Sequence, residues 1–225
     1  MSKRDRRDAL RRRRAFRLPR PRFLIVCEGT LTEPGYFQET RHLERSVIDL
    51  EISPGGAPKA LVERAVEKKK AAERLAKSQQ DSNLRYDQVW CVFDIDEHRL
   101  IPEAKQQARD NGIELAISNP CFELWVLLHF RDQRAHIERG PLHHECKQYI
   151  PGYEKQLPTA QLHPRCDVAL RRAKDLDQWQ KSRGCEGENP STGGLQTHGT
   201  NQKLAPAFKR TVATSARAVA RRVGL

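Results

Sequence analysis

The chain has 225 residues, of which 37% are hydrophobic and 31% are charged, and its formal net charge is +12 at pH 7. This length gives room for a sizeable core. No stretch approaches the roughly 18 continuous apolar residues that a membrane-spanning helix needs. The composition therefore argues against a membrane protein and predicts a soluble globular one.

Most of the net charge lies at the start of the chain. The first 22 residues contain ten Arg and one Lys against two Asp, so they carry +9 of the +12. We expect residues 1–21 to be a flexible basic arm that contacts the phosphates of nucleic acid and releases counterions. The plainer alternative is a solvated tail.

Between the arm and residue 130, strand-like and helix-like segments alternate. The expected elements are, in chain order, strand Arg22–Cys27, a helix that opens at Thr32, strand Val47–Ile52, helix Ala57–Lys77, strand Val89–Phe93, helix Pro102–Asn111, strand Ile113–Ile117 and helix Cys121–Phe130. This alternation is typical of β-α-β units. It predicts an α/β fold in which helices cover both faces of a parallel sheet.

Beyond residue 130 the periodic pattern weakens. We expect a helix at Asp167–Lys181, a mobile loop near 184–199 that is rich in Gly, Ser, Thr and Asn, and a basic helix at Ala205–Val223. The predicted organisation is thus a basic arm at 1–21, an α/β core at 22–130 and a mainly helical C-terminal extension at 131–225.

Six cysteines are widely spaced, and no C-x-x-C occurs. Neither a disulfide framework nor a zinc ribbon is indicated, so a reducing, cytoplasmic location is expected. One alternative zinc site combines His144 and Cys146 with His163 and Cys166. These are suitable zinc ligands, although their spacing matches no common zinc finger.

Acidic residues directly follow two of the predicted strands. Glu28 follows the first strand, and Asp94 and Asp96 follow the strand Val89–Phe93. The carboxyl ends of parallel strands meet at one edge of a sheet, where ligands bind. Oxygen ligands of this kind suit Mg²⁺ or Mn²⁺, which also bind substrate phosphates and support phosphodiester chemistry. Glu33 is either a further metal ligand or a carboxylate that complements the dipole of the helix it opens.

Several strings of the sequence resemble the RloB-like family, which comprises bacterial and archaeal proteins often found near restriction-modification genes. The similar strings are Ile25–Gly29, Thr32–Phe37, Phe93–His98, Ser118–Trp125 and Leu128–Phe130, and the resemblance covers roughly residues 20–160. The family is similar in turn to the Toprim fold of topoisomerases, primases and the nucleases of overcoming-lysogenization-defect type.

The resemblance implies roles for the acidic residues. Glu28 would be a metal ligand or general acid/base, and Asp94 and Asp96 would be the metal-binding pair. It also implies anti-phage defence beside an ATPase of the AAA type. We therefore expect a Mg²⁺-dependent nuclease acting on DNA or RNA, including transfer RNA. The alternative is a noncatalytic nucleic-acid-binding adaptor for the ATPase. A homo-oligomer is compatible with either function.

Two further residues are candidates for the catalytic site. Glu123 begins the helix after Ser118-Asn119-Pro120, and the family string favours it as a site residue, whereas the residue types alone suggest a helix cap. Lys155, in Tyr153-Glu154-Lys155, matches a Tyr-x-Lys of the family and would stabilise charge in the transition state. His129, on an apolar helix face, is expected to be a core residue.

Overall fold

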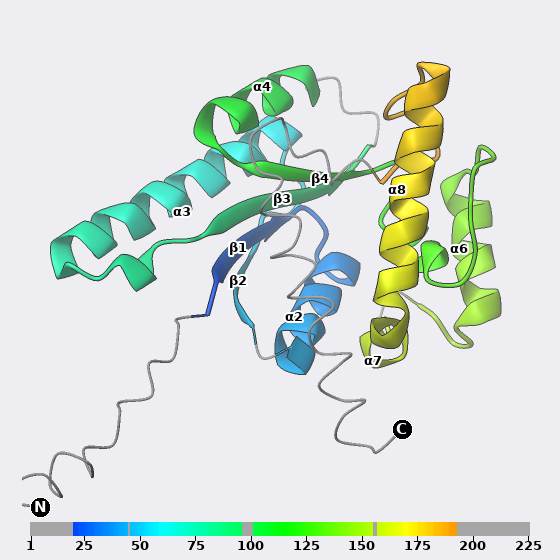
Figure 1. Cartoon of the computed structure of the whole chain (residues 1–225), viewed down its shortest axis with the longest axis horizontal. Helices are drawn as coiled ribbons and strands as arrows, with labels where there is room; N and C mark the ends of the chain where they lie inside the picture. Colours follow the sequence, from blue (N-terminus) through cyan, green and yellow to red (C-terminus); the bar gives the residue numbers. More distant parts are fainter. Residues whose placement is uncertain (1–19, 45, 96–100, 155–156, 193–225) are drawn as a thin grey trace, which may run out of the picture.

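The structure is a computed structural model that describes residues 20–44, 46–95, 101–154 and 157–192. Its centre is a four-stranded sheet in which every neighbouring pair of strands is parallel (Figure 1). The strands are β1 (Arg22–Cys27), β2 (Val47–Ile52), β3 (Gln88–Asp94) and β4 (Glu114–Ser118), in the order β2-β1-β3-β4. The predicted α/β fold with a parallel sheet is confirmed.

The two central strands are apolar along nearly their whole length. Five of the six residues of β1 and six of the seven of β3 are buried, as expected for parallel strands that are covered on both faces. Successive side chains of a strand point to opposite faces. Phe23, Ile25 and Val92 therefore belong to one hydrophobic cluster, and Leu24 and Cys91 belong to the other.

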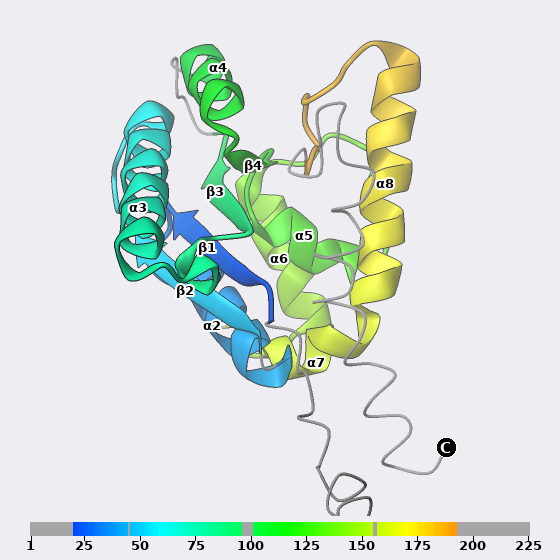
Figure 2. The same cartoon turned by 60° about the vertical axis from the view of Figure 1, so that its left-hand side comes forward.

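Helices cover both faces of the sheet (Figure 2). α3 (Pro58–Gln79) and α4 (Ile101–Asn111) lie on one side, and α2 (Thr32–Glu44) and α5 (Glu123–Leu128) lie on the other. The buried contact residues of α3 and α4 are mainly alanines, which are small enough to let the helices approach the sheet closely. The long α3 shows its charged residues to solvent, which matches its sparse apolar stripe.

The region after residue 130 adds more helices to the α5 side. These are α6 (Arg139–Tyr149), α7 (Thr159–Leu162), the 3₁₀ turn η2 (His163–Arg165) and α8 (Cys166–Arg183). Leu142, Leu162 and Leu176 from these helices join the same buried cluster as Phe23 and Ile25. The expected helix at Asp167–Lys181 is confirmed as α8, whereas the sequence indicated neither α6 nor α7.

The described part of the predicted mobile loop is held by hydrogen bonds. Asn119 and Ser191 exchange two backbone hydrogen bonds of 2.7 and 2.8 Å, and the Asn189 side chain bonds both backbone groups of Ile137. Residues 193–199, the expected helix Ala205–Val223 and the arm up to residue 19 lie outside the described residues. No helix within the described ranges has both the length and the apolar character to cross a membrane.

Candidate active site

Two acidic residues end neighbouring strands at the carboxyl edge of the sheet. The backbone N–H of Glu28, just after β1, donates to the carbonyl of Val92 in β3 at 3.0 Å. Asp94 is the last residue of β3, and its partner in β4 is Ser118. The parallel register therefore brings Glu28 and Asp94 to one edge, as the sequence predicted. Asp96 lies outside the described residues.

Glu33 is buried in the first turn of α2, where its carboxylate lies against Gly29. A Cβ atom on Gly29 would stand only 2.0 Å from Oε2 of Glu33, so this arrangement requires glycine at position 29. Burial raises the pKa of Glu33. The carboxylates of Glu123 and Glu28 raise it further, while a hydrogen bond from its own backbone and the charge of Arg139 lower it. The hydrogen bond with its own backbone agrees with a carboxylate at the helix start, and the role of Glu33 as a metal ligand stays a prediction.

Glu123 opens α5, and a residue of the C-terminal region holds its carboxylate. The hydroxyl of Tyr153 donates to Oε1 of Glu123 at 3.0 Å. Burial raises the pKa of Tyr153, the charge of Glu123 raises it further, and a hydrogen bond with the Thr32 side chain lowers it. Phe122, which precedes Glu123, packs edge-on against Tyr36 and Phe37 of α2. The start of α5 is thereby anchored against α2.

Arg139 completes the site, although sequence reasoning missed it. Its Nη2 atom lies 3.3 Å from Oδ2 of Asp94 and 3.2 Å from the carbonyl oxygen of Pro120. Arg139 begins α6 and stands 45 residues after Asp94 in a stretch without periodicity. Its positive charge was the one available signal, and 41 Lys and Arg residues share that signal.

The string Ser118-Asn119-Pro120 does more than precede a helix. The residue before α5 is Phe122, and no side chain caps that helix. Asn119 instead bridges to Ser191, and its side chain donates to the carbonyl of Gly187 at 2.9 Å. The cap interpretation is therefore wrong, because the string ties residues 187–191 to the edge of the sheet.

Tyr153 also places one end of the predicted Tyr-x-Lys motif at the site. Lys155 lies outside the described residues, so its expected role stays a prediction. His129 is confirmed as a core residue. It is buried, its Nδ1 lies 2.9 Å from the carbonyl oxygen of Trp125, and burial lowers its pKa to about 4.

The alternative zinc ligands do not gather in the described structure. Cys146 points its thiol to the carbonyl of Glu123, His163 pairs with Glu44, and Cys166 contacts His129. Within the described ranges, no three His, Cys, Asp or Glu side chains are grouped so that they could hold a metal ion. The zinc alternative therefore has no support in this part of the chain.

The described carboxylates at the sheet edge are likewise not grouped as a metal site, but their oxygen atoms are the ligand type that a hard divalent cation takes. Four carboxylates belong to the site, those of Glu28, Glu33, Asp94 and Glu123, and the charges of Glu28 and Glu123 both act on Glu33. The charges of Glu123 and Asp94 both raise the pKa of Cys121, which burial raises most. Carboxylate oxygens are the ligands that Mg²⁺ prefers, with water and substrate phosphates completing its coordination.

Comparison with known protein families matches residues 23–194 with the family described as RloB-like protein. The matched range covers more than half of the chain and contains every described residue of the site. It also reaches beyond residue 160, the approximate end of the resemblance noted in the sequence, and includes α8. A search of curated proteins and a search of solved structures found no match.

Proposed function

The chain belongs to the RloB-like protein family, and we propose that it is a Mg²⁺-dependent nuclease of a bacterial anti-phage defence or restriction-linked system. The observation that carries the proposal is the placement of Glu28 and Asp94 after neighbouring strands, at the carboxyl edge of a parallel sheet. A Toprim-like relationship of the fold and cleavage of DNA or RNA, including transfer RNA, belong to the same proposal.

Electrostatics supports a cation at this edge. Glu33 is buried and lies within reach of the charges of Glu28 and Glu123. Like charges that lie close together and out of water are unfavourable, so the protonated form of Glu33 is favoured. A divalent cation offsets this repulsion and also permits the approach of a polyanionic substrate, which four carboxylates would otherwise repel.

The site residues would have different roles, which depend on their positions. Glu28 and Asp94 would hold the cation, with Asp96 added from the sequence pattern and Glu33 as a further ligand. The cation would supply polarisation of the scissile phosphate and a lower pKa for an attacking water. Tyr153 orients the Glu123 carboxylate through its hydrogen bond. Fixed orientation of this kind matters because misplaced catalytic groups lose much of their effect.

The proposed partners are suggested by the family resemblance and by the charge of the chain. We include in the proposal a partner ATPase of the AAA type and a nucleic-acid substrate bound by the basic arm at 1–21. The first 22 residues carry +9, and such charge favours phosphate through counterion release.

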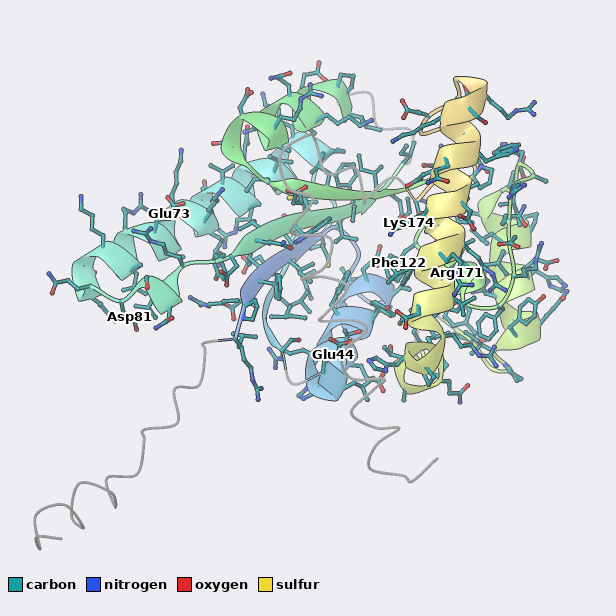
Figure 3. All side chains as sticks on the ribbon, viewed as in Figure 1. Glu44, Glu73, Asp81, Phe122, Arg171 and Lys174 are labelled. Atoms are coloured by element: carbon teal, nitrogen blue, oxygen red, sulfur yellow. The ribbon has the colours of Figure 1, made fainter. Side chains whose placement is uncertain are left out.

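Cleavage assays test the proposal directly. The purified full chain is incubated with plasmid DNA, single-stranded DNA and total transfer RNA, each with Mg²⁺, Mn²⁺ or EDTA. Asp94→Asn removes a ligand charge. We expect it to reduce cleavage by more than the roughly 10- to 100-fold that loss of an outer partner of a ligand costs. Glu73→Gln is the matched control, because Glu73 lies on α3, far from the sheet edge (Figure 3).

Each outcome has a distinct meaning. Metal-dependent cleavage that Asp94→Asn loses and Glu73→Gln keeps would support the nuclease and identify its substrate. Cleavage that persists in Asp94→Asn would contradict the proposed site. Nucleic-acid binding without cleavage, both alone and with the partner ATPase added, would favour the noncatalytic adaptor.

A further inference from the structure

We propose that Arg139 changes partners during the reaction: it pairs with Asp94 in the metal-free site and binds a phosphate of the nucleic acid in the loaded site. The inference deepens the proposed function and rests on it, because it takes Asp94 to be a metal ligand. It adds a phosphate-binding residue that the sequence motifs do not contain.

The contact between Arg139 and Asp94 is suited to exchange. One nitrogen, Nη2, approaches both Oδ2 of Asp94 at 3.3 Å and the carbonyl oxygen of Pro120 at 3.2 Å. Strong charge-assisted hydrogen bonds of this type are about 2.7–2.9 Å long and often bidentate. The Arg139 side chain is also 48% exposed. A contact of this length near solvent is a weak one.

The guanidinium of Arg139 nevertheless lies beside the Asp94 carboxylate at this edge. The guanidinium therefore offsets part of the negative charge at the sheet edge. This is the role that a bound cation would also fill.

A cation at Asp94 and the guanidinium of Arg139 would compete for the same carboxylate. Two positive groups beside one oxygen repel each other, so binding of the cation releases Arg139 from Asp94. The group best suited to receive a released guanidinium is a phosphate, whose oxygens match its planar donors. Nucleic acid brings such a phosphate to the edge where the cation binds.

The surroundings of Arg139 permit this movement. Its backbone begins α6, which Leu142 anchors with a fully buried side chain. A Cβ atom on the neighbouring Gly140 would meet no heavy atom of the described residues within 4 Å. The backbone at Arg139 is thus anchored, while the Arg139 side chain is about half exposed.

Competition gives a signature that a structural role would not give. In the full-length protein stripped with EDTA, Mn²⁺ binding is measured by calorimetry without nucleic acid, and the thermal midpoint is recorded for each variant. Arg139→Gln should bind Mn²⁺ about two- to fivefold more tightly, as expected from loss of a weak ion pair. The same variant should cleave nucleic acid at least about tenfold more slowly at saturating Mn²⁺. Arg139→Lys keeps a positive charge beside Asp94, so its Mn²⁺ affinity should stay near wild type. Lysine cannot make a bidentate contact with a phosphate, so cleavage should fall.

Arg64→Gln is the matched control. The Arg64 side chain is 44% exposed and pairs with Glu51 and Glu67, neither of which belongs to the site. Arg64→Gln removes one positive charge, as Arg139→Gln does, and we expect it to change neither the Mn²⁺ affinity nor the rate of cleavage. A similar gain in Mn²⁺ affinity in Arg64→Gln would overturn the proposal, because it would show an effect of net charge alone.

The remaining outcomes separate this proposal from the nuclease proposal. If Asp94→Asn abolishes Mn²⁺ binding but Arg139→Gln binds no more tightly than wild type at an unchanged thermal midpoint, only the role of Arg139 is overturned. Cleavage by Arg139→Gln at the wild-type rate would overturn the same role. If the wild-type protein binds no Mn²⁺, both proposals fail.

Discussion

At the scale of single residues, the contact between Gly29 and Glu33 shows how a side chain decides the identity of its neighbour. A methyl group at position 29 would overlap the Glu33 carboxylate, with 2.0 Å between Cβ and Oε2. We expect Gly29→Ala to lower the free energy of unfolding by about 1–3 kcal/mol, the usual cost of overpacking. Glu33→Ala in the same chain should restore most of the loss, since it removes the overlapping group. Urea unfolding of both single variants and the double variant measures this coupling. An equal cost of Gly29→Ala with and without the Glu33 carboxylate would show that the overlap is not the cause.

Tyr153, like Arg139, brings the C-terminal region to the site. Tyr153→Phe removes the hydroxyl that donates to Glu123 at 3.0 Å and leaves the buried ring in place. We expect a loss of about 1 kcal/mol in the free energy of unfolding. We also expect cleavage to fall about 10- to 100-fold, because Glu123 loses its orienting partner. Tyr149→Phe is the matched control, since Tyr149 is exposed. Equal activity of the two variants would contradict the orienting role.

The sequence predicted site residues that follow strands or begin helices, and it missed Arg139. Glu28 and Asp94 could be placed because a parallel sheet brings successive strand ends to one edge, so local patterns imply a distant contact. Arg139 and Tyr153 reach the edge from a region without helical or strand periodicity. Their positions depend on how α6 packs against α5, which no local pattern encodes.

At the scale of elements, the end of α2 meets the 3₁₀ turn η2 of the C-terminal region through a buried pair. Oε1 of Glu44 lies 3.0 Å from Nε2 of His163, and the Glu44 side chain is almost fully covered. Burial raises the pKa of Glu44 to about 8 and lowers the pKa of His163. Both residues therefore favour their neutral forms near pH 7.

This pair predicts a pH dependence of stability. Between the ordinary pKa of Glu44 and about 8, the folded chain binds more protons at this carboxyl than the unfolded chain, so the free energy of unfolding falls as pH rises. Glu44→Gln keeps the shape without the titration, and it should gain roughly 2 to 4 kcal/mol relative to wild type between pH 5 and pH 8. Urea unfolding across this range measures the difference. Parallel curves for the two proteins would contradict the prediction.

Elements with a clear period were predictable, and those without one were not. β1 and β2 have the predicted bounds, because Arg22–Cys27 and Val47–Ile52 carry apolar or alternating patterns between turn residues. α6 buries only Leu142 and Cys146, and it begins with Arg139-Gly140-Pro141, in which Gly and Pro resemble loop residues. Pro is well tolerated in the first turn of a helix. Tertiary packing, more than a local signal, sets this helix.

At the scale of the whole molecule, the helices after residue 130 belong to the core of the sheet. Leu142, Leu162 and Leu176 share a buried cluster with Phe23 and Ile25 of β1. A sheet whose strands are apolar on both faces needs cover on both. The predicted boundary at residue 130 marks a change in sequence pattern, and the packing continues across it.

This continuity predicts that a change in α6 destabilises the whole fold. Leu142 is fully buried and lies well outside the sheet in sequence. Leu142→Ala should lower the global free energy of unfolding by about 2–5 kcal/mol, the cost of a cavity in a packed core. The opening free energy obtained from amide hydrogen exchange in β1 and β3 should fall by the same amount, because the sheet and α6 unfold together.

Leu75→Ala provides the matched control for this experiment. Leu75 lies on α3 with 45% of its surface exposed, so the same truncation there should cost less than about 0.5 kcal/mol. If Leu142→Ala accelerates exchange only in α6 and leaves β1 and β3 protected, the C-terminal helices unfold as a separate unit. The boundary at residue 130 would then be a domain boundary. If exchange accelerates equally in both parts, Glu123 and Arg139 are held by one cooperative structure, and the site cannot be assembled without the C-terminal helices.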